Sequence, residues 1–150
     1  PDARLVIAGD NRSWPRQDLA ATVAAHGIAS QVQVLDFVSD ATLDTLFSRA
    51  SVFAFLSEYE GFGLTALEAL ASGVPCVVLD TEVAREIYGD AVVYAPPGDL
   101  AGTADVIGRL LTSRADGEAM LARAPAILSR YSWARAADQT LAVLEAAVER

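Results

Sequence analysis

The chain has 150 residues, 53% of them hydrophobic, and a formal net charge of −9 at pH 7. This length and composition predict one domain with a sizeable buried core. The negative charge argues against a nucleic-acid partner, because that binding depends mostly on Lys and Arg at the phosphates. All 11 basic residues are Arg, and they are scattered along the chain. No apolar run approaches the roughly 18 residues of a membrane-spanning helix, so we expect no transmembrane segment in this chain.

Short apolar runs alternate along the chain with segments of helical periodicity. The runs are continuous, which is typical of parallel strands covered on both faces. The predicted strands are residues 5–8, 32–35, 52–56, 76–79 and 92–94. The predicted helices are residues 16–26, 41–49, 64–72, 82–87, 100–112, 116–129 and 132–149. This order predicts an α/β fold with a Rossmann-like, doubly wound parallel sheet, flanking helices and extra C-terminal helices.

Glycines and a proline-rich turn mark several element boundaries. Gly27 and Gly73 stand where the C-terminal caps of helices belong, and Asp99 stands where a helix begins. The last predicted helix, residues 132–149, has an apolar face that we expect to pack on this domain or on a neighbouring one. With no internal repeat and no low-complexity linker, residues 1–150 are predicted to be a single domain.

The chain has one Cys and one His, so no zinc site is expected. Cys76 lies in an apolar run and is predicted to be a buried structural thiol. A single unpaired Cys is compatible with a reducing compartment. Pro1 leads into a strand with no signal peptide in view, and we expect the chain to be part of a longer protein.

Ligands of doubly wound sheets bind beyond the carboxyl ends of the strands. Three loops at that edge carry polar or flexible residues: residues 9–12, 36–39 and 57–63. In the third loop, Glu60 follows a predicted strand and is separated by a Gly-Phe-Gly turn from the next helix. Glu68 stands eight positions later, in the first or second turn of that helix. The two acids would therefore approach a ligand from different elements.

This stretch has the chemistry to bind a sugar joined to a diphosphate. Carboxylates such as Glu60 and Glu68 accept charge-assisted hydrogen bonds from paired sugar hydroxyls. Glycines let backbone N–H groups come close to a ligand. The unpaired N–H groups of the first helical turn, near Leu64 and Thr65, suit a phosphate. The same spacing also allows a plain alternative, in which one acid caps the helix and the other is a solvated helix residue.

A long string around these acids resembles a known family. The string is Ser57-x-Tyr59-Glu60-Gly61-Phe62-Gly63-Leu64-x-x-Leu67-Glu68-Ala69-Leu70-Ala71-x-Gly73-x-Pro75. It resembles the E-x7-E signature of glycosyltransferase family 4 (group 1), in the C-terminal, donor-binding domain of these retaining GT-B enzymes. Shorter similar strings at residues 5–9, 37–38, 89–91 and 131–133 extend the likeness over the chain.

The resemblance implies roles for the two acids and for one further loop. Glu60 would contact the donor sugar and support the retaining chemistry, which makes it the predicted catalytic residue. Glu68 would hold the ribose hydroxyls of the nucleotide. Phe37 and Val38 would lie against the nucleobase.

The resemblance also implies donor contacts from the backbone between the acids. Gly61, Phe62 and Gly63 would offer backbone groups to the sugar. Leu64 and Thr65 would offer amides to the diphosphate. Many relatives have Pro where Thr65 stands, which leaves the role of this side chain open.

For the whole enzyme, the resemblance implies a retaining, metal-independent hexosyltransferase of bacterial carbohydrate or cell-envelope polysaccharide biosynthesis. It would be cytoplasmic, with peripheral contact at the inner face of the membrane, and would use a nucleotide-diphosphate sugar as donor substrate and no cofactor. The acceptor would be a sugar, a lipid or another molecule held by an N-terminal domain. The family's diphosphate-binding Arg and Lys should precede Pro1, so we expect this fragment alone to be inactive.

Other functions compete with this interpretation. A phospho-receiver domain needs a Lys on a late loop, and the chain has none. A dinucleotide-binding domain would carry Gly-x-Gly-x-x-Gly after its first strand, which the residues after Gly9 do not supply. A non-catalytic carbohydrate-binding or partner-binding module on the same fold stays open, because fold alone does not decide activity.

Overall fold

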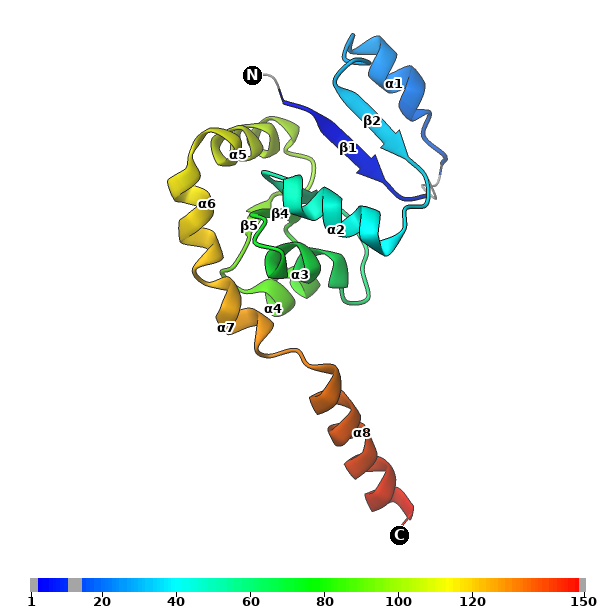
Figure 1. Ribbon diagram of the computed structural model, residues 1–150, viewed down its shortest axis with the longest axis vertical. Coiled ribbons are helices and arrows are strands. Elements are labelled where there is room, and N and C mark those ends of the chain that lie inside the picture. The colour runs from blue at the N-terminus through cyan, green and yellow to red at the C-terminus, as the bar shows by residue number, and fades with distance from the viewer. Residues whose placement is uncertain (1–2, 11–14, 149–150) are drawn as a thin grey trace. The chain divides into compact units, whose positions relative to one another are not determined.

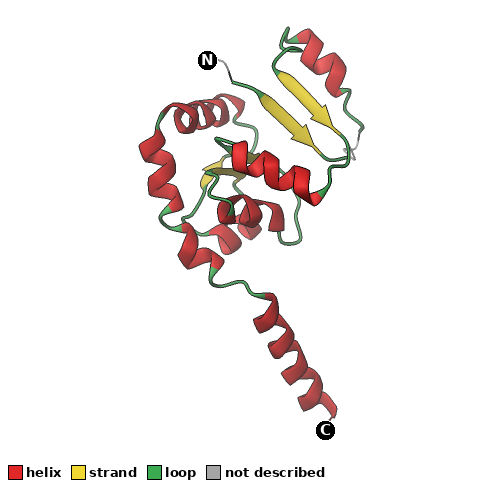
Figure 2. Ribbon diagram, viewed as in Figure 1, coloured by secondary structure: helices red, strands yellow, loops and turns green. Residues whose placement is uncertain are grey.

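The computed structural model describes residues 3–10 and 15–148. Asn11 and Arg12, which belong to the first of the three predicted ligand loops, lie outside the described residues. The chain divides into two compact units, Pro1–Thr45 and Leu46–Arg150. Each unit is built from parallel strands and helices, as Figures 1 and 2 show.

The first unit contains a two-stranded parallel sheet. Strand β1 (Leu5–Ala8) pairs with β2 (Val32–Leu35), and the helix between them is α1 (Leu19–Ala25). The helix begins later than predicted, because the Asp18 side chain accepts a hydrogen bond from the Ala21 N–H at 2.9 Å and caps it. Helix α2 (Asp40–Arg49) follows β2 and continues across the division between the units.

The second unit contains a three-stranded parallel sheet in the order β3-β4-β5. Its strands are β3 (Phe53–Phe55), β4 (Cys76–Leu79) and β5 (Val93–Ala95). The crossover between β3 and β4 contains α3 (Leu64–Ala71), and the next crossover contains α4 (Glu82–Tyr88). Strand β4 is central, and its first three residues are at most 1% exposed, which explains its continuous apolar sequence.

Four helices follow β5: α5 (Leu100–Thr112), α6 (Arg114–Leu121), α7 (Ala124–Leu128) and α8 (Trp133–Val148). The prediction of one helix over residues 116–129 is wrong, because the segment forms α6 and α7. Pro125, in the first turn of α7, has no N–H to donate to a carbonyl of α6, so it does not continue that helix, whereas a proline is tolerated in the first turn of a new one. The start of α5 at Asp99 is confirmed, since its carboxylate accepts from the Gly102 N–H at 2.9 Å.

The core of the second unit lies between β4, β5 and the helices that follow. Val77, Ala95, Leu110 and Met120 form a buried cluster, to which parts of β5 and α5 add partly buried side chains. Helix α8 takes no part in this core, because none of its residues is buried. The predicted packing of its apolar face on this domain is therefore not observed, and packing on a neighbouring domain stays a prediction.

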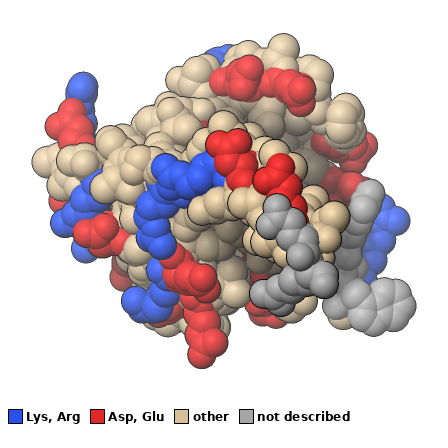
Figure 3. All heavy atoms as spheres, turned by 90° about the horizontal axis from the view of Figure 1, so that it is seen from below, with Lys and Arg blue, Asp and Glu red and all other residues tan. Residues whose placement is uncertain are grey.

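The α/β class with parallel strands and flanking helices is confirmed, as are the extra C-terminal helices. Among the described residues, no helix is long and apolar enough to cross a membrane. Figure 3 shows a face on which Arg and acidic side chains are intermixed, so the basic residues there do not form a continuous patch.

Candidate functional site

The loop from β3 to α3 carries the predicted donor site. It turns sharply after β3, where the Ser57 hydroxyl donates to the backbone carbonyl of Tyr59 at 3.1 Å. Tyr59 itself is 90% exposed, whereas the next residue, Glu60, is half-buried. The turn therefore directs one side chain outward and brings the following carboxylate against the protein.

Gly63 ends this loop and is the N-cap of α3. Its backbone is left-handed, with φ 84° and ψ 48°, a conformation that glycine adopts without steric cost. Since glycine has no side chain, it gives α3 no side-chain cap. The first-turn N–H groups, beginning with Leu64 and Thr65, have no partner within the helix. They form a set of aligned donors with the positive end of the helix dipole behind them, suited to an anion.

Glu60 and Phe62 line one small pocket beside this helix start. The remaining walls come from β3, β4 and α4, and most of them are apolar. The lining residues are Phe55, Ser57, Glu60, Phe62, Val78, Leu79, Thr81, Val83, Ala84 and Tyr88. Glu60 supplies the only carboxylate among these residues, so the pocket combines an apolar wall with a single negative group.

Tyr88, at the end of α4, forms part of this pocket and also contacts the end of the loop. It is 2% exposed, and its hydroxyl donates to the Gly63 carbonyl oxygen at 2.6 Å. Burial, with a smaller contribution from the negative charge of Glu60, raises the pKa of Tyr88 to about 12. The hydroxyl therefore stays protonated at neutral pH and remains a hydrogen-bond donor.

Glu68 lies in the second turn of α3 and its side chain is exposed. Its backbone carbonyl accepts a hydrogen bond from the Ser72 hydroxyl at 2.9 Å, near the C-terminus of the helix. Gly73 ends the helix with φ 77°, which confirms its predicted position at the C-terminal cap. The carboxylate of Glu68 is thus accessible to a ligand from the helix, while Glu60 is accessible from the loop.

The predicted nucleobase residues lie in the other unit. Phe37 is 92% exposed and Val38 is half-buried, both in the segment between β2 and α2. Their contact with a base stays a prediction.

The loop between β4 and α4 has a structural arrangement of its own. Arg85 donates two hydrogen bonds of 2.6 Å to the two oxygens of Asp80, and its guanidinium lies 4.5 Å from the centre of the Tyr94 ring. The paired guanidinium lowers the pKa of Asp80. Thr81 caps α4 by accepting from the Ala84 N–H at 3.1 Å. These groups order the start of α4, which forms one wall of the Glu60 pocket.

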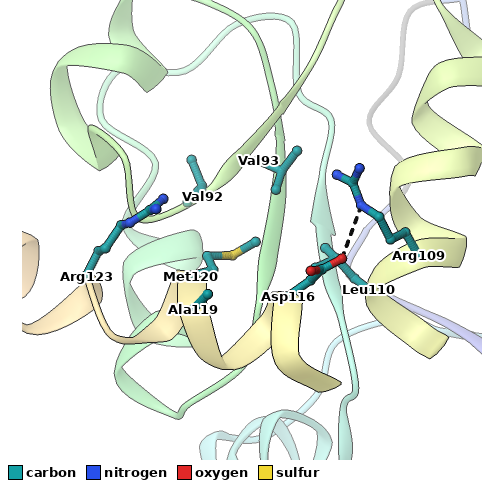
Figure 4. A pocket seen from close by; sticks show the side chains of 8 residues that line it. All are labelled: Val92, Val93, Arg109, Leu110, Asp116, Ala119, Met120 and Arg123. Carbon is teal, nitrogen blue, oxygen red and sulfur yellow. Dashed lines mark ion pairs between the residues drawn. The ribbon is translucent and has the colours of Figure 1, made fainter. Parts of the chain in front are cut away.

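A second pocket lies between β5, α5 and α6 (Figure 4). It shares no lining residue with the first pocket. Arg109 and Arg123 stand on opposite sides of its apolar floor. Both are engaged within the chain, since the Arg109 Nε lies 3.4 Å from the Asp116 carboxylate and the Arg123 Nη1 donates to the Asp90 carbonyl at 3.2 Å. The described residues contain no group of three or more His, Cys, Asp or Glu that could hold a metal ion.

The sequence did not predict a role in the site for Tyr88 or for Tyr131. Tyr131 meets the Phe62 ring edge to face, with centroids 5.2 Å apart. A buried Tyr usually finds a partner for its hydroxyl, so a Tyr at the end of a helix that precedes an apolar strand was an available signal. That signal does not reveal which carbonyl receives the bond.

Comparison with known proteins decides the family. Residues 1–127 match the family described as Glycosyl transferases group 1. The chain belongs to this family. The group 1 match covers the first unit and residues 46–127 of the second, and it includes every residue predicted to contact the donor.

Curated group 1 relatives are similar along most of this chain. The O-antigen chain mannosyltransferase B of Escherichia coli is 32% identical over 91% of the chain. The GDP-mannose:cellobiosyl-diphosphopolyprenol alpha-mannosyltransferase of Komagataeibacter xylinus is 37% identical over 86% of the chain. The matched part is only 36% and 34% of these two proteins, so the chain spans about a third of their length.

Solved structures resemble this group 1 chain in fold. The crystal structure of Anabaena HepE in complex with UDP-glucose has a TM-score of 0.80 at 21% identity, over 96% of this chain and 41% of that one. Sucrose-phosphate synthase from Thermosynechococcus elongatus has a TM-score of 0.76 at 19% identity, over 99% of this chain and 47% of that one. At this level of identity, the likeness establishes the shared α/β fold.

Proposed function

We propose that this chain is the donor-binding part of a retaining, metal-independent hexosyltransferase that uses a nucleoside-diphosphate sugar. The observation that carries the proposal is the uncapped N-terminus of α3, which directly follows the loop that bears Glu60. Family membership and the lengths of the relatives support it, since they leave room for a second, acceptor-binding domain in the complete enzyme. That enzyme would act in the cytoplasm, in contact with the inner face of the membrane.

In this proposal the diphosphate lies at the start of α3. The amides of Leu64 and Thr65 donate to its oxygens, and the helix dipole stabilises the charge that grows on the leaving group during transfer. These donors are already aligned before the donor binds, so little reorganisation is needed in the reaction. The carboxylate of Glu68 accepts hydrogen bonds from the ribose hydroxyls.

The sugar lies on the loop side, next to the Glu60 pocket. The backbone of Gly61, Phe62 and Gly63 contacts its hydroxyls, and the half-buried carboxylate of Glu60 stabilises the positive charge that develops at the anomeric carbon. The acceptor attacks from the same face as the departing diphosphate, which retains the anomeric configuration. Phe37 and Val38 contact the nucleobase.

Two negative carboxylates beside a diphosphate require basic groups to balance them. Repulsion between charges at such short range costs a few kcal/mol in a partly desolvated cleft. No Lys is present in the chain, and we propose that the complete enzyme supplies basic residues from outside it. Residues 1–150 alone should therefore bind a nucleotide sugar weakly and show no turnover. Sub-micromolar binding to this fragment in calorimetric titration would contradict that expectation.

The decisive experiment compares acid variants of the complete enzyme. Donor candidates are screened first, starting with GDP-mannose and UDP-glucose, because the names of relatives and neighbours contain these molecules. Glu60→Gln should lower kcat by about 10²–10³-fold, since it removes transition-state charge stabilisation. Glu68→Ala should raise the donor KM by about tenfold or more with a small change in kcat.

Glu86→Gln is the matched control, because Glu86 is an exposed acid on α4 that does not line the pocket. Its kinetics should equal those of the wild type. Wild-type kinetics in both Glu60→Gln and Glu68→Ala would refute the site assignment. Binding of the donor without any turnover by the complete protein would instead favour the non-catalytic module. Activity that survives removal of divalent ions with EDTA is expected, and its loss would contradict the metal-independent mechanism.

A further inference from the structure

The hydroxyl of Tyr88 is bound to the last residue of the donor loop. It donates to the Gly63 carbonyl at 2.6 Å, across 25 positions of sequence, and both residues are buried. The bond runs from the C-terminal end of α4 to the N-cap of α3. It is a contact between two elements and contributes nothing to the hydrogen bonding within either helix.

The Gly63 carbonyl and the Leu64 N–H belong to one peptide unit. That unit is planar and trans, so its C=O and N–H point in opposite directions. A partner that holds the carbonyl oxygen therefore also sets the direction of the N–H at the start of α3. A hydrogen bond accepted by the carbonyl polarises the unit as well and makes its N–H a stronger donor.

The loop has a second attachment to the same end of α4. The Phe62 ring packs edge to face on Tyr131, and the Tyr131 hydroxyl donates to the Ile87 carbonyl at 3.1 Å. Ile87 is the immediate neighbour of Tyr88. Two successive loop residues, Phe62 and Gly63, are thus held against one helix end by two tyrosines.

We propose that Tyr88 is a positioning residue for the diphosphate, which acts by orienting the Gly63–Leu64 peptide so that the Leu64 N–H faces the ligand. This inference rests on the proposed function and concerns the same site. Tyr88 itself does not touch the donor in this arrangement. It acts through the peptide whose oxygen accepts its hydrogen bond.

The test uses Tyr88→Phe in the complete protein, which removes one hydroxyl and keeps the ring. Calorimetry compares the nucleoside diphosphate of the preferred donor with the same nucleoside lacking phosphates. The affinity for the diphosphate should fall by about tenfold, the loss expected for one misaligned charge-assisted hydrogen bond, while nucleoside binding should not change. In turnover assays, the donor KM should rise more than kcat falls.

Tyr94→Phe is the matched control. The Tyr94 hydroxyl also donates to a glycine carbonyl at 2.6 Å, that of Gly89 just after α4, and it makes no bond to the donor loop. Tyr94→Phe should lower the melting temperature in the same way as Tyr88→Phe but leave diphosphate affinity unchanged.

Three results would bear on different claims. Equal diphosphate affinity in the wild type and Tyr88→Phe would overturn the positioning role and leave the proposed function standing. A loss of affinity of the same size in Tyr94→Phe would also overturn it, because the effect would then be general destabilisation. A wild-type protein that binds no nucleoside diphosphate would overturn the proposed function itself.

Discussion

Tyr88 occupies the space in which a side chain at Gly63 would lie. A Cβ added to Gly63 collides with the Tyr88 hydroxyl and comes within 3.4 Å of the Phe55 ring. Two independent features therefore favour glycine at position 63. One is its left-handed backbone, and the other is the Tyr88 hydroxyl that donates to its carbonyl. The same tyrosine therefore restricts both the sequence of the loop and its conformation.

Replacement of Gly63 by Ala should destabilise the protein by about 2–4 kcal/mol, the sum of left-handed strain and an overpacked contact. Substitutions at two other glycines allow the cost of strain and the cost of overpacking to be measured separately. Gly73 has φ 77° but no atom within 4 Å of the place that a Cβ would take, so Gly73→Ala should show the strain alone, about 1–2 kcal/mol. Gly61 has open space and no positive φ, so Gly61→Ala should change stability by at most about 0.5 kcal/mol. Urea denaturation measures all three.

A double variant tests the collision directly. Tyr88→Phe removes the hydroxyl oxygen with which a Cβ at position 63 would collide. Gly63→Ala should therefore cost less in the Tyr88→Phe background than in the wild type, while retaining the cost of strain. Equal costs in the two backgrounds would show that the hydroxyl does not limit position 63.

Stability at alkaline pH should depend on Tyr88. Its pKa rises from 10.0 to about 12 on folding, because burial disfavours the charged phenolate. Its contribution is fully present below pH 10 and is lost as the pH rises through 12, since only the unfolded state ionises in that interval. At about 1.4 kcal/mol per pKa unit, the loss is up to about 2–3 kcal/mol.

Urea denaturation between about pH 9 and pH 12 checks this expectation. The stability difference between the wild type and Tyr88→Phe should shrink as the pH rises through this interval. The chain has no Lys, so fewer groups titrate there and the comparison is cleaner than in most proteins. Parallel curves for the two proteins would contradict the assignment.

Cys76 should be unreactive in the folded protein. It is fully buried in β4, its Sγ–H donates to the Val74 carbonyl at 3.3 Å, and burial raises its pKa from 9.0 to about 12. The thiolate fraction at about pH 8 is then about 10³-fold lower than that of an exposed thiol. Alkylation followed by mass spectrometry should detect modification only after unfolding. Ser72→Cys in a Cys76→Ala background supplies an exposed thiol that should react at once.

The ion pair between Asp80 and Arg85 should shift the titration of the carboxylate. Its pKa is lowered by the two hydrogen bonds from Arg85, so its contribution to stability is present above pH 3.8 and is lost as the pH falls through the lowered value. Carboxyl-carbon NMR should detect this lowered pKa, and Arg85→Gln should return it toward 3.8. Arg114→Gln, which breaks the exposed Arg114–Glu118 pair, should leave the Asp80 titration unchanged.

Local signals predicted most of the elements. Strands β1, β2 and β4 have the predicted boundaries, because short runs rich in Val, Ile and Leu between turn residues are a local mark of strands. The glycines at 27 and 73 have positive φ as expected of helix caps. The break between α6 and α7 was missed although its cause, Pro125, is equally local.

The sequence by itself determined the family and the order of groups in the donor loop: an acid, two glycines that free the backbone, a helix start and a second acid. These features can be predicted because the residues are adjacent in the sequence. Backbone preferences, and the groups that a short loop offers to a ligand, depend on residues that are adjacent in the sequence. Only the tertiary structure decided that Glu60 and Phe62 share a pocket with α4 and that Tyr88 holds the Gly63 carbonyl. That bond spans 25 residues, and its geometry depends on how α3 and α4 pack around the sheet, which no local pattern specifies.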